Sequence, residues 1–249
     1  NIYILNQSEA ITQKIKSYSD ILFDPKIVDV FLYLAKIESF WLNISTDRFK
    51  DILNDWGKNI YLKLSLNNLE EITSVFAKII DRKSAFTARH SSGVATLAAL
   101  ISSEMNFSVE KQQAIRIAGL IHDIGKLIIP KNILEKNGKL NDNEFNIIKQ
   151  HPFYTYKLLN NIKGLSTISR WAAYHHEKMD GTGYPFKLNK NKLDLGCRIM
   201  AVSDIFQALT EERPYRPAYK ITKAMEILKK YGTYGKLDTE IISVLEKNI

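Results

Sequence analysis

Apolar residues recur at intervals of three and four positions along most of this chain, and that spacing places them on one face of an α-helix. Near the C-terminus, Ile221, Ala224, Met225 and Leu228 follow the pattern i, i+3, i+4 and i+7. Similar groups occur earlier, namely Ile27, Val28, Phe31, Leu32 and Ala35; Ile72, Val75, Phe76 and Ile79; Leu97, Leu100 and Ile101; and Ile115, Ala118 and Ile121. Strand-like alternation is scarce. The sequence therefore predicts an all-α fold.

Breaks between the helices are predicted where Gly, Pro and Asn gather, at residues 55–58, 130–141, 180–191 and 213–217. Pro25 suits the first turn of a helix. Asn141, with Glu144 three residues later, resembles a capping box. Residues 1–65 contain no His and no cluster of chemically active side chains. We predict that they form a helical lead-in, which is a candidate for a separate subdomain.

The overall charge favours an anionic partner but does not identify it. The chain carries 35 Lys and Arg against 27 Asp and Glu, a formal net charge of +8. Nucleotides, nucleic acids and lipid surfaces all suit such a charge. Much of the excess is Lys in a sequence rich in Asn and Ile, a mix that genomic base composition produces. The charge therefore carries little weight, and no nucleic-acid-reading motif supports a nucleic-acid partner.

The single cysteine, Cys197, excludes an internal disulfide and a zinc site built on cysteines, and it fits a reducing compartment. The longest apolar run, residues 94–101, is far shorter than the roughly 20 residues of a membrane span. We expect no membrane segment within this chain. Because the chain begins with Asn1, we expect it to be a fragment, with any sensor domain or membrane anchor lying upstream.

The histidines supply the main functional signal. There are five, and they are His90, His122, His151, His175 and His176. A lone His in a helical protein is more often a packed core or surface residue than a ligand. These histidines, however, lie in helical segments with small or apolar neighbours, where an unpaired imidazole is costly to bury. His151 is expected at the end of the helix "EFNIIKQHP". A shared metal site would give all of them a partner.

Two acids follow the same logic. Asp123 and Asp204 lie among apolar helical neighbours, where a free carboxylate is unfavourable; a helix cap is the alternative, more plausible for Asp204 after Ser203. Imidazole and carboxylate ligands without thiolate suit Fe, Mn, Zn, Ni or Co. The combined set exceeds the needs of one ion. Two ions roughly 3.5–4 Å apart, a recurring arrangement for phosphoester hydrolysis, would use it fully.

At these residues the sequence resembles a known family. The "HD" of "GLIHDIGK" is similar to the HD superfamily of metal-dependent phosphohydrolases, and "HHEKMDGTGYP" at residues 175–185 resembles the signature of its HD-GYP branch. "DRKSAFTARHS", "IKQHP" and "ALTEERPYR" also occur in the family's order, over about residues 67–234. The resemblance implies a helical bundle around a dinuclear metal centre, with residues 66–249 as the HD-GYP catalytic domain.

The resemblance also implies the roles of the metal ligands. One ion would be held by His90, His122, Asp123 and Asp204. The second would be held by Asp123, His151, His175 and His176. Asp123 would therefore bridge two divalent ions, with Fe or Mn expected. A bridging water or hydroxide would be the nucleophile.

Substrate-binding roles are implied for Lys126, Gly183, Tyr184, Pro185, Arg213 and Arg216. Lys126 follows His122 by four residues, on the same helix face, and would contact the scissile phosphate or the leaving oxygen; a solvated Lys at a helix end is the alternative. Gly181, Gly183 and Pro185 would turn the chain towards the substrate. Tyr184 has two open roles, stacking on a guanine or packing back as an anchor. Without the resemblance, Arg213 and Arg216 would pass for an ordinary basic loop.

The sequence departs from the family pattern at two positions. Some members hold a third metal through a Glu four residues before the first His, where this chain has Phe86, so a two-metal site is expected. An Asp often stands three residues after Asp204, where this chain has Gln207, and this puts the nucleotide preference in question. The segment "ILFDPKIVDVFLYLAKIESFWLNI" resembles the tail of HD-GYP domains, so residues 1–65 fit the remnant of a preceding HD domain.

The expected activity is metal-dependent hydrolysis of the bacterial second messenger cyclic di-GMP to linear pGpG, with further hydrolysis to GMP left open. The alternatives are a phosphodiesterase for another cyclic dinucleotide such as cyclic GMP-AMP, a simpler HD nucleotide phosphohydrolase, and a non-catalytic cyclic-dinucleotide receptor. The resemblance implies a bacterial cytoplasmic protein, with an upstream sensor or signalling partner and a membrane anchor both open. The oligomeric state is not predicted.

Overall fold

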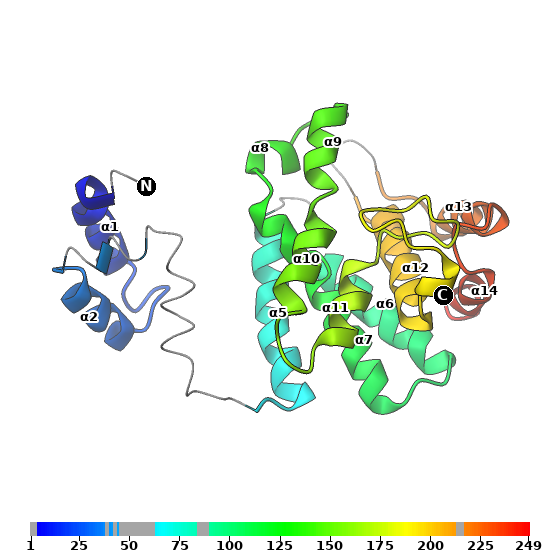
Figure 1. Cartoon of the computed structure of the whole chain (residues 1–249), viewed down its shortest axis with the longest axis horizontal. Coiled ribbons are helices and arrows are strands. Elements are labelled where there is room, and N and C mark those ends of the chain that lie inside the picture. The colour runs from blue at the N-terminus through cyan, green and yellow to red at the C-terminus, as the bar shows by residue number, and fades with distance from the viewer. Residues whose placement is uncertain (1–3, 38–39, 42–43, 45–62, 84–89, 213–216) are drawn as a thin grey trace. The chain divides into compact units, whose positions relative to one another are not determined.

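The computed structural model describes the chain except for residues 1–3, 38–39, 42–43, 45–62, 84–89 and 213–216 (Figure 1). The all-α prediction is confirmed, because the described residues form helices and no β-strand beyond isolated bridges at Ser19–Phe23 and Asp180–Asn189. None of the helices among the described residues combines the length and apolar character of a membrane span. The chain divides into two compact units, Asn1–Lys63 and Leu64–Ile249.

The first unit contains α1 (Ile4–Ser17) and α2 (Pro25–Leu34). The carboxylate of Asp24 accepts a hydrogen bond from the Lys26 N–H at 2.8 Å and caps α2, with Pro25 in the first turn as expected. The predicted apolar face is only partly buried, because Val28 is enclosed whereas Ile27 is 67 % exposed.

The helices of the second unit, apart from two short 3-10 segments, are α5 to α14. Their bounds are α5 (Leu66–Lys83), α6 (His90–Glu104), α7 (Val109–Ile121), η1 (Ile124–Ile128), α8 (Lys131–Leu134), α9 (Asp142–Ile148), α10 (His151–Leu159), α11 (Ser166–Ala173), η2 (Lys190–Lys192), α12 (Leu195–Thr210), α13 (Ile221–Thr233) and α14 (Thr239–Lys247). The predicted capping box is confirmed: Asn141 accepts from the Glu144 N–H at 2.9 Å, and the Glu144 carboxylate accepts from the Asn141 N–H at 2.8 Å.

The core of the second unit forms where α6 packs against α7 and α12. Gly119 on α7 permits a close helix crossing, because a Cβ there would lie 2.6 Å from the Ala95 Cα on α6. Ile115, Ile199 and Val202 are fully enclosed in this core. These contacts fix the elements that carry the polar cluster described below.

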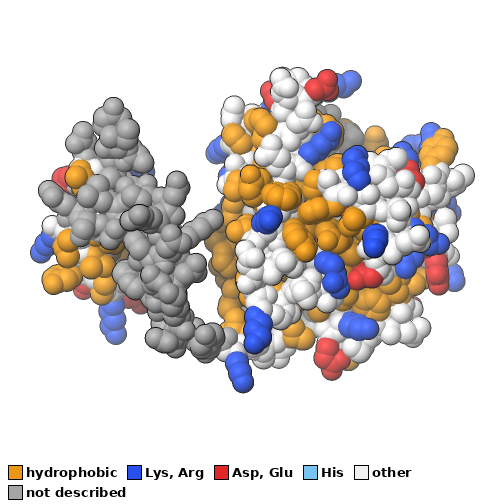
Figure 2. Space-filling view, viewed as in Figure 1, with side chains coloured by type: hydrophobic (Ala, Val, Ile, Leu, Met, Phe, Trp, Pro, Cys, Tyr) orange, Lys and Arg blue, Asp and Glu red, His pale blue; other side chains and the backbone are white. Residues whose placement is uncertain are grey.

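Helix α5 does not bury its most apolar face. The apolar positions of its helical repeat, Ile72, Val75, Phe76 and Ile79, are 41–57 % exposed. The buried face instead carries Thr73, Ala77, Ile80 and Asp81. Hydrophobic side chains also reach the surface over α10, on the face drawn in Figure 2. The pattern predicted the helix correctly, and the packing of α5 decides which face is buried.

Candidate metal centre

A polar cluster lies inside the second unit where several helix ends meet. The structure brings together all the ligands proposed from the sequence: His90 at the start of α6, His122 and Asp123 after α7, His151 at the start of α10, His175 and His176 after α11, and Asp204 within α12. All of these side chains are buried except that of His176, which is partly exposed.

Two expectations about local structure are corrected here. His151 begins α10 instead of ending the preceding helix, which stops at Ile148. The chain around His122 is not one continuous helix, because α7 ends at Ile121 and a 3-10 helix begins at Ile124. Asp123 stands at the start of that 3-10 helix but makes no capping hydrogen bond through its side chain. Asp204 lies inside α12, so it is not a cap either.

The ends of α7 and α10 are held together by close backbone contacts. A Cβ on Gly125 would lie 2.0 Å from the His151 carbonyl oxygen, so only glycine permits this approach. The Thr155 hydroxyl donates to the His122 carbonyl at 2.9 Å and accepts from the Gly125 N–H at 3.1 Å. These contacts place the His122–Asp123 turn against His151.

One hydrogen-bond arrangement is repeated at three of the four buried histidines. At each of the three, Nδ1 lies 2.6–2.7 Å from the carbonyl oxygen three residues earlier; the pairs are His122 with Gly119, His151 with Ile148, and His175 with Ala172. A carbonyl oxygen can only accept, so Nδ1 carries the proton. The Nε2 lone pair of each ring therefore faces the centre, as in metal-binding histidines.

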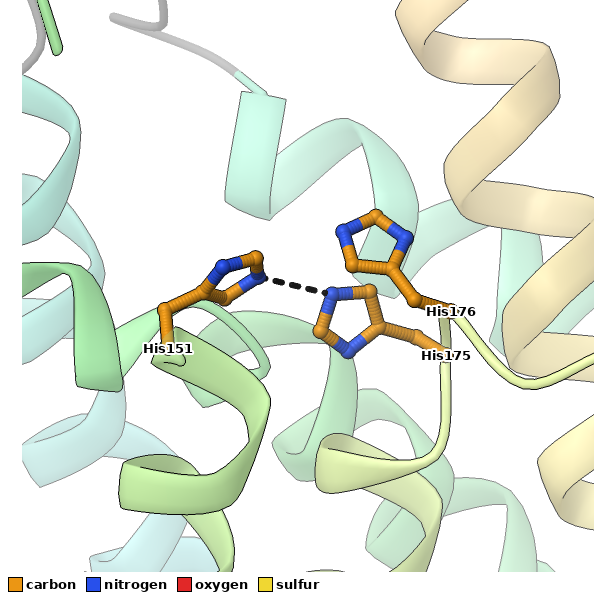
Figure 3. Close-up of side chains that lie close together, drawn as sticks. All are labelled: His151, His175 and His176. Atoms are coloured by element: carbon orange, nitrogen blue, oxygen red, sulfur yellow. Dashed lines mark hydrogen bonds between the residues drawn. The ribbon is translucent and has the colours of Figure 1, made fainter. Parts of the chain in front are cut away.

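These lone pairs face one another without a proton to share. The Nε2 atoms of His151 and His175 lie 3.3 Å apart (Figure 3). His122 Nε2 and Asp123 Oδ1 are buried and have no hydrogen-bond partner among the residues that the structure describes. Burial lowers the pKa of His175 to about 3, so this ring is neutral. Divalent cations would satisfy all these atoms, and the donor set fits such ions.

The two carboxylates divide the cluster. Asp123 lies 3.2 Å from His151 Nε2, 3.4 Å from His122 Nε2 and 3.9 Å from His175 Nε2. Asp204 lies 3.2 Å from His90 Nε2, 3.7 Å from His122 Nε2 and 3.6 Å from His176 Nδ1. His122 thus faces both carboxylates.

Both carboxylates are held ionised. Burial alone would raise the pKa of Asp123, but the Lys126 charge and the His122 imidazole hold it well below its usual range. Burial likewise opposes ionisation of Asp204, and the hydrogen bond with His90 together with the neighbouring histidine rings holds its pKa well below its usual range. The cluster therefore offers anionic oxygens beside the neutral imidazoles of His175 and His176.

Glu211 is a functional candidate that the sequence did not reveal. Its Oε2 lies 2.9 Å from His90 Nδ1, on the side of the ring opposite Asp204. Gln207 Nε2 donates to Glu211 Oε1 at 2.8 Å. Burial alone would lower the pKa of His90, but the hydrogen bonds with Asp204 and Glu211 raise it to about 9. The only sequence signal is the spacing of Glu211 after Asp204, two turns along the same helical segment.

Lys126 lies next to the cluster. Its Nζ is 2.5 Å from Asp123 Oδ2, and its side chain is 21 % exposed, so it reaches from the centre towards solvent. The predicted same-face spacing on an α-helix does not apply, because Lys126 belongs to the 3-10 helix η1. Its phosphate-contacting role remains a proposal.

The loop after His176 is organised around a second missed residue, Glu177. This buried carboxylate accepts from the Phe186 N–H at 2.7 Å and the Leu188 N–H at 2.9 Å. Gly181 has a φ of 77°, as the turn prediction required. Gly183 is needed for a different reason, because a Cβ there would lie 2.4 Å from the Glu177 Cα. The Tyr184–Pro185 peptide bond is cis.

Tyr184 lies against the cluster. Its ring centroid is 4.8 Å from that of His176 and 6.2 Å from that of Phe145. Burial and the charges of Asp204 and Asp123 raise the pKa of its hydroxyl, so Tyr184 stays neutral. This packing favours the anchoring role over a free stacking surface. Arg213, Arg216 and Phe86 lie outside the described residues.

A cavity of about 330 Å³ opens beside the cluster. Its lining residues are His175, His176, Glu177, Lys178, Tyr184, Asp204, Ile205, Ala208, Leu209 and Tyr231. Metal ions bound by the histidines would therefore border a space that a small molecule can enter.

The sequence of this chain is similar to those of known proteins. A family model described as "HD domain" matches residues 74–241. The 3'3'-cGAMP-specific phosphodiesterase 1 of Vibrio cholerae serotype O1 is 35 % identical over 232 residues, 92 % of this chain and 54 % of the relative. The cyclic di-GMP phosphodiesterase response regulator RpfG of Xanthomonas campestris pv. campestris is 34 % identical over 182 residues, 71 % of this chain and 48 % of the relative.

A solved structure extends the match to the fold. The crystal structure of a cyclic GMP-AMP-specific phosphodiesterase of V. cholerae, V-cGAP3, aligns with a TM-score of 0.52 at 32 % identity, covering 99 % of this chain and 57 % of that chain. This chain belongs to the HD domain family. Its relatives and its intact "HHEKMDGTGYP" segment confirm the resemblance to the HD-GYP branch. The chain spans about half the length of the curated relatives it matches. Family membership and the His–Asp cluster together indicate divalent metal binding.

Proposed function

We propose that this domain hydrolyses cyclic di-GMP to linear pGpG in a metal-dependent reaction. The observation that carries the proposal is the set of buried Nε2 lone pairs and carboxylate oxygens that converge beside the 330 Å³ cavity. Relatives named as cyclic-dinucleotide phosphodiesterases support the substrate class. The relevant bond in such a substrate is a phosphodiester, whose cleavage needs a nucleophile and charge stabilisation at the phosphoryl oxygens.

The proposed ligands follow the division of the cluster. His90, His122 and Asp204 lie close enough to hold one ion, and so do His151, His175 and His176. His122, Asp123 and His175 form a third close group between them, which supports Asp123 as the bridge. We assign two ions, Fe or Mn, because both accept nitrogen and oxygen ligands readily. When bound, such a pair lowers the pKa of a water molecule and neutralises charge on a phosphoryl group.

The remaining residues bind and orient the substrate. The Lys126 ammonium, which pairs with Asp123 Oδ2 at 2.5 Å, is placed to contact a phosphoryl oxygen or the leaving ribose oxygen near the cluster. Asp123 itself stays ionised and holds the ligand geometry. Tyr184 lines the cavity and packs against His176, and Gly183 and Pro185 flank it in the same loop and are proposed to bind the substrate with it. Arg213 and Arg216 are proposed from the resemblance as bidentate phosphate donors.

A second candidate substrate is 3'3'-cyclic GMP-AMP. The observation that favours it is the 35 % identity with a V. cholerae phosphodiesterase named for that compound. A non-catalytic receptor is the third candidate. The intact ligand set argues against it, since each proposed ligand lies in place.

The domain assignment follows from the same residues. We propose that 66–249 form the catalytic domain and that 1–65 form a lead-in, the remnant of a preceding HD domain. The family match at residues 74–241 supports the first assignment. We expect the domain to act in a reducing bacterial cytoplasm, which the buried free thiol of Cys197 suits.

The test is to purify the protein anaerobically, measure metal per chain, and assay cyclic di-GMP, 3'3'-cyclic GMP-AMP and cyclic di-AMP separately. About two Fe or Mn per chain with pGpG as product is the expected result. Preferred turnover of cyclic GMP-AMP would select the second candidate. Full metal loading with no turnover of any of the three would leave a receptor.

A further inference from the structure

The cavity beside the cluster is also lined by residues that the proposed reaction does not use. Besides the histidines, its lining includes Lys178 and Tyr231. Ile205, Ala208 and Leu209 on α12 provide an apolar part of the same lining. A volume of about 330 Å³ is at the small end of ligand pockets, so it suits one nucleotide of a cyclic dinucleotide.

Lys178 is held firmly by its backbone. The Met179 N–H donates to the Lys236 carbonyl at 3.0 Å, and the Gly181 N–H donates to the Lys178 carbonyl at 2.9 Å. A Cβ on Gly183 would lie 2.5 Å from the backbone nitrogen of Lys178, so the loop packs directly on the backbone of this residue. The base of the Lys178 side chain is therefore fixed relative to the metal centre.

Tyr231 fixes the other end of the same side chain. The Lys178 Nζ lies 4.6 Å from the centroid of the Tyr231 ring, which is a cation–π contact. Tyr231 belongs to α13 and packs against the core, and its carbonyl accepts from the Lys236 N–H at 3.0 Å. Within the part of the chain that the structure describes, no carboxylate forms an ion pair with Lys178. The ammonium therefore keeps its donors for a ligand in the cavity.

We propose that Lys178, oriented by Tyr231, recognises a guanine base of the substrate and so sets the nucleotide preference of the site. The planar base would lie along the apolar part of the lining, with its O6 and N7 edge towards the ammonium. This inference rests on the proposed cyclic-dinucleotide function. It extends that function by naming residues that distinguish guanine from adenine.

The chemistry of the two bases explains the preference. Guanine presents two acceptors, O6 and N7, on one edge, and Lys is a common partner for that edge. Adenine presents N7 beside the N6 amino group, which is a donor. An ammonium has hydrogen-bond donors only. If adenine bound in the same position, its N6 amino group, which is also a donor, would face the Lys178 ammonium without forming a hydrogen bond. Cyclic di-GMP and cyclic GMP-AMP each supply a guanine, whereas cyclic di-AMP does not.

The experiment measures binding separately from turnover. The metal-loaded protein is titrated with hydrolysis-resistant phosphorothioate analogues of cyclic di-GMP and cyclic di-AMP, and the ratio of the two Kd values is the readout. Lys178→Met keeps the apolar stem and removes the donors. The guanine preference is expected to fall by about 5- to 100-fold, the usual worth of one good base-edge contact.

Matched variants isolate each part of the inference. Lys178→Arg restores donors for the O6 and N7 edge and is expected to retain the preference. Tyr231→Phe keeps the ring and is expected to bind like the parent, whereas Tyr231→Leu removes the cation–π contact and is expected to lose part of the preference. Metal per chain is measured for each variant, and it should match the parent because none of these groups lies among the proposed ligands.

Two results would overturn the inference. If Lys178→Met weakens both analogues equally, Lys178 attracts phosphate and does not read the base. If the ratio stays unchanged with Kd unaltered, the Lys178–Tyr231 pair only supports the fold. Failure of the proposed function would give a different result. The wild-type protein would then turn over none of the natural cyclic dinucleotides, whatever the ratio of the two Kd values.

Discussion

His90 Nδ1 and Glu211 Oε2 lie 2.9 Å apart, so a carboxylate holds the outer nitrogen of this imidazole while Nε2 faces Asp204. The other buried histidines use backbone carbonyls for the same purpose. A carboxylate at the outer nitrogen fixes the ring and raises its basicity as a ligand. His90 is therefore supported by a side chain that mutation can test.

We predict that Glu211→Gln weakens metal binding by about 10- to 100-fold, the usual effect of removing such a partner. Competition with a chromophoric chelator measures this directly. Glu212→Gln is the matched control, because it removes the same charge one residue away at an exposed position. Equal affinities for the two variants would show that the Glu211 contact does not act on the metal.

Asp123→Ala is expected to abolish binding of both ions and all turnover together. The carboxylate lies within 3.2–3.9 Å of the Nε2 atoms of His122, His151 and His175, so its removal takes away the oxygen ligand that these rings share. Metal analysis and assay of the same preparation provide the measurement. Asp29→Ala, at an exposed position on α2, is the control. A variant that kept two ions and full turnover would refute the bridging assignment.

The sequence predicted the type of this site better than its surroundings. Residue chemistry alone selected His90, His122, His151, His175, His176, Asp123 and Asp204, because buried imidazoles and carboxylates need partners wherever the fold places them. Glu211 was missed because a carboxylate beside an exposed Glu in a polar segment has no distinguishing pattern. Its role appears only when α12 passes the start of α6.

Packing decides the features that periodicity leaves open. The repeat at Ile72, Val75, Phe76 and Ile79 correctly indicated a helix, yet the opposite face is buried through Ala77 and Ile80. A small residue such as Ala77 allows α5 to pack closely against α7. The local sequence does not indicate which face of the helix will contact another helix. His151 was likewise placed at a helix end, whereas the turn at residues 149–150 starts a new helix there.

Gly183→Ala is predicted to destabilise the loop and the centre together. The added Cβ would lie 2.4 Å from the Glu177 Cα and 2.6 Å from the His176 carbonyl oxygen, and these are backbone atoms that cannot move without shifting His176. Overpacking of this kind costs about 1–3 kcal/mol. Urea unfolding measures the loss, and metal per chain should fall as well. Ala at Gly181, whose surroundings are open, should leave metal content closer to the parent, and the opposite order would contradict this account of the loop.

Arg213→Ala is predicted to weaken substrate binding without changing metal content. The reason is the proposed role of its guanidinium as a phosphate donor, which involves none of the ligand atoms. A raised KM with unchanged metal per chain is the expected result. Loss of metal in this variant would place Arg213 at the centre instead of at the substrate.

Chelation should lower the thermal stability of the protein, and added Mn²⁺ should restore it. The Nε2 atoms of His151 and His175 lie 3.3 Å apart, and Asp123 Oδ1 is buried with no hydrogen-bond partner in the described part of the chain, so bound cations would stabilise the folded state. Ligands that bind only the folded state stabilise it by about 4 kcal/mol at a thousandfold excess over Kd. A calorimetric scan before and after chelation, with Asp123→Ala as the control, tests the expectation. The melting temperature of the variant should not change with either treatment, because the variant lacks the metal site. An equal change in both proteins would mean that the metal binds elsewhere.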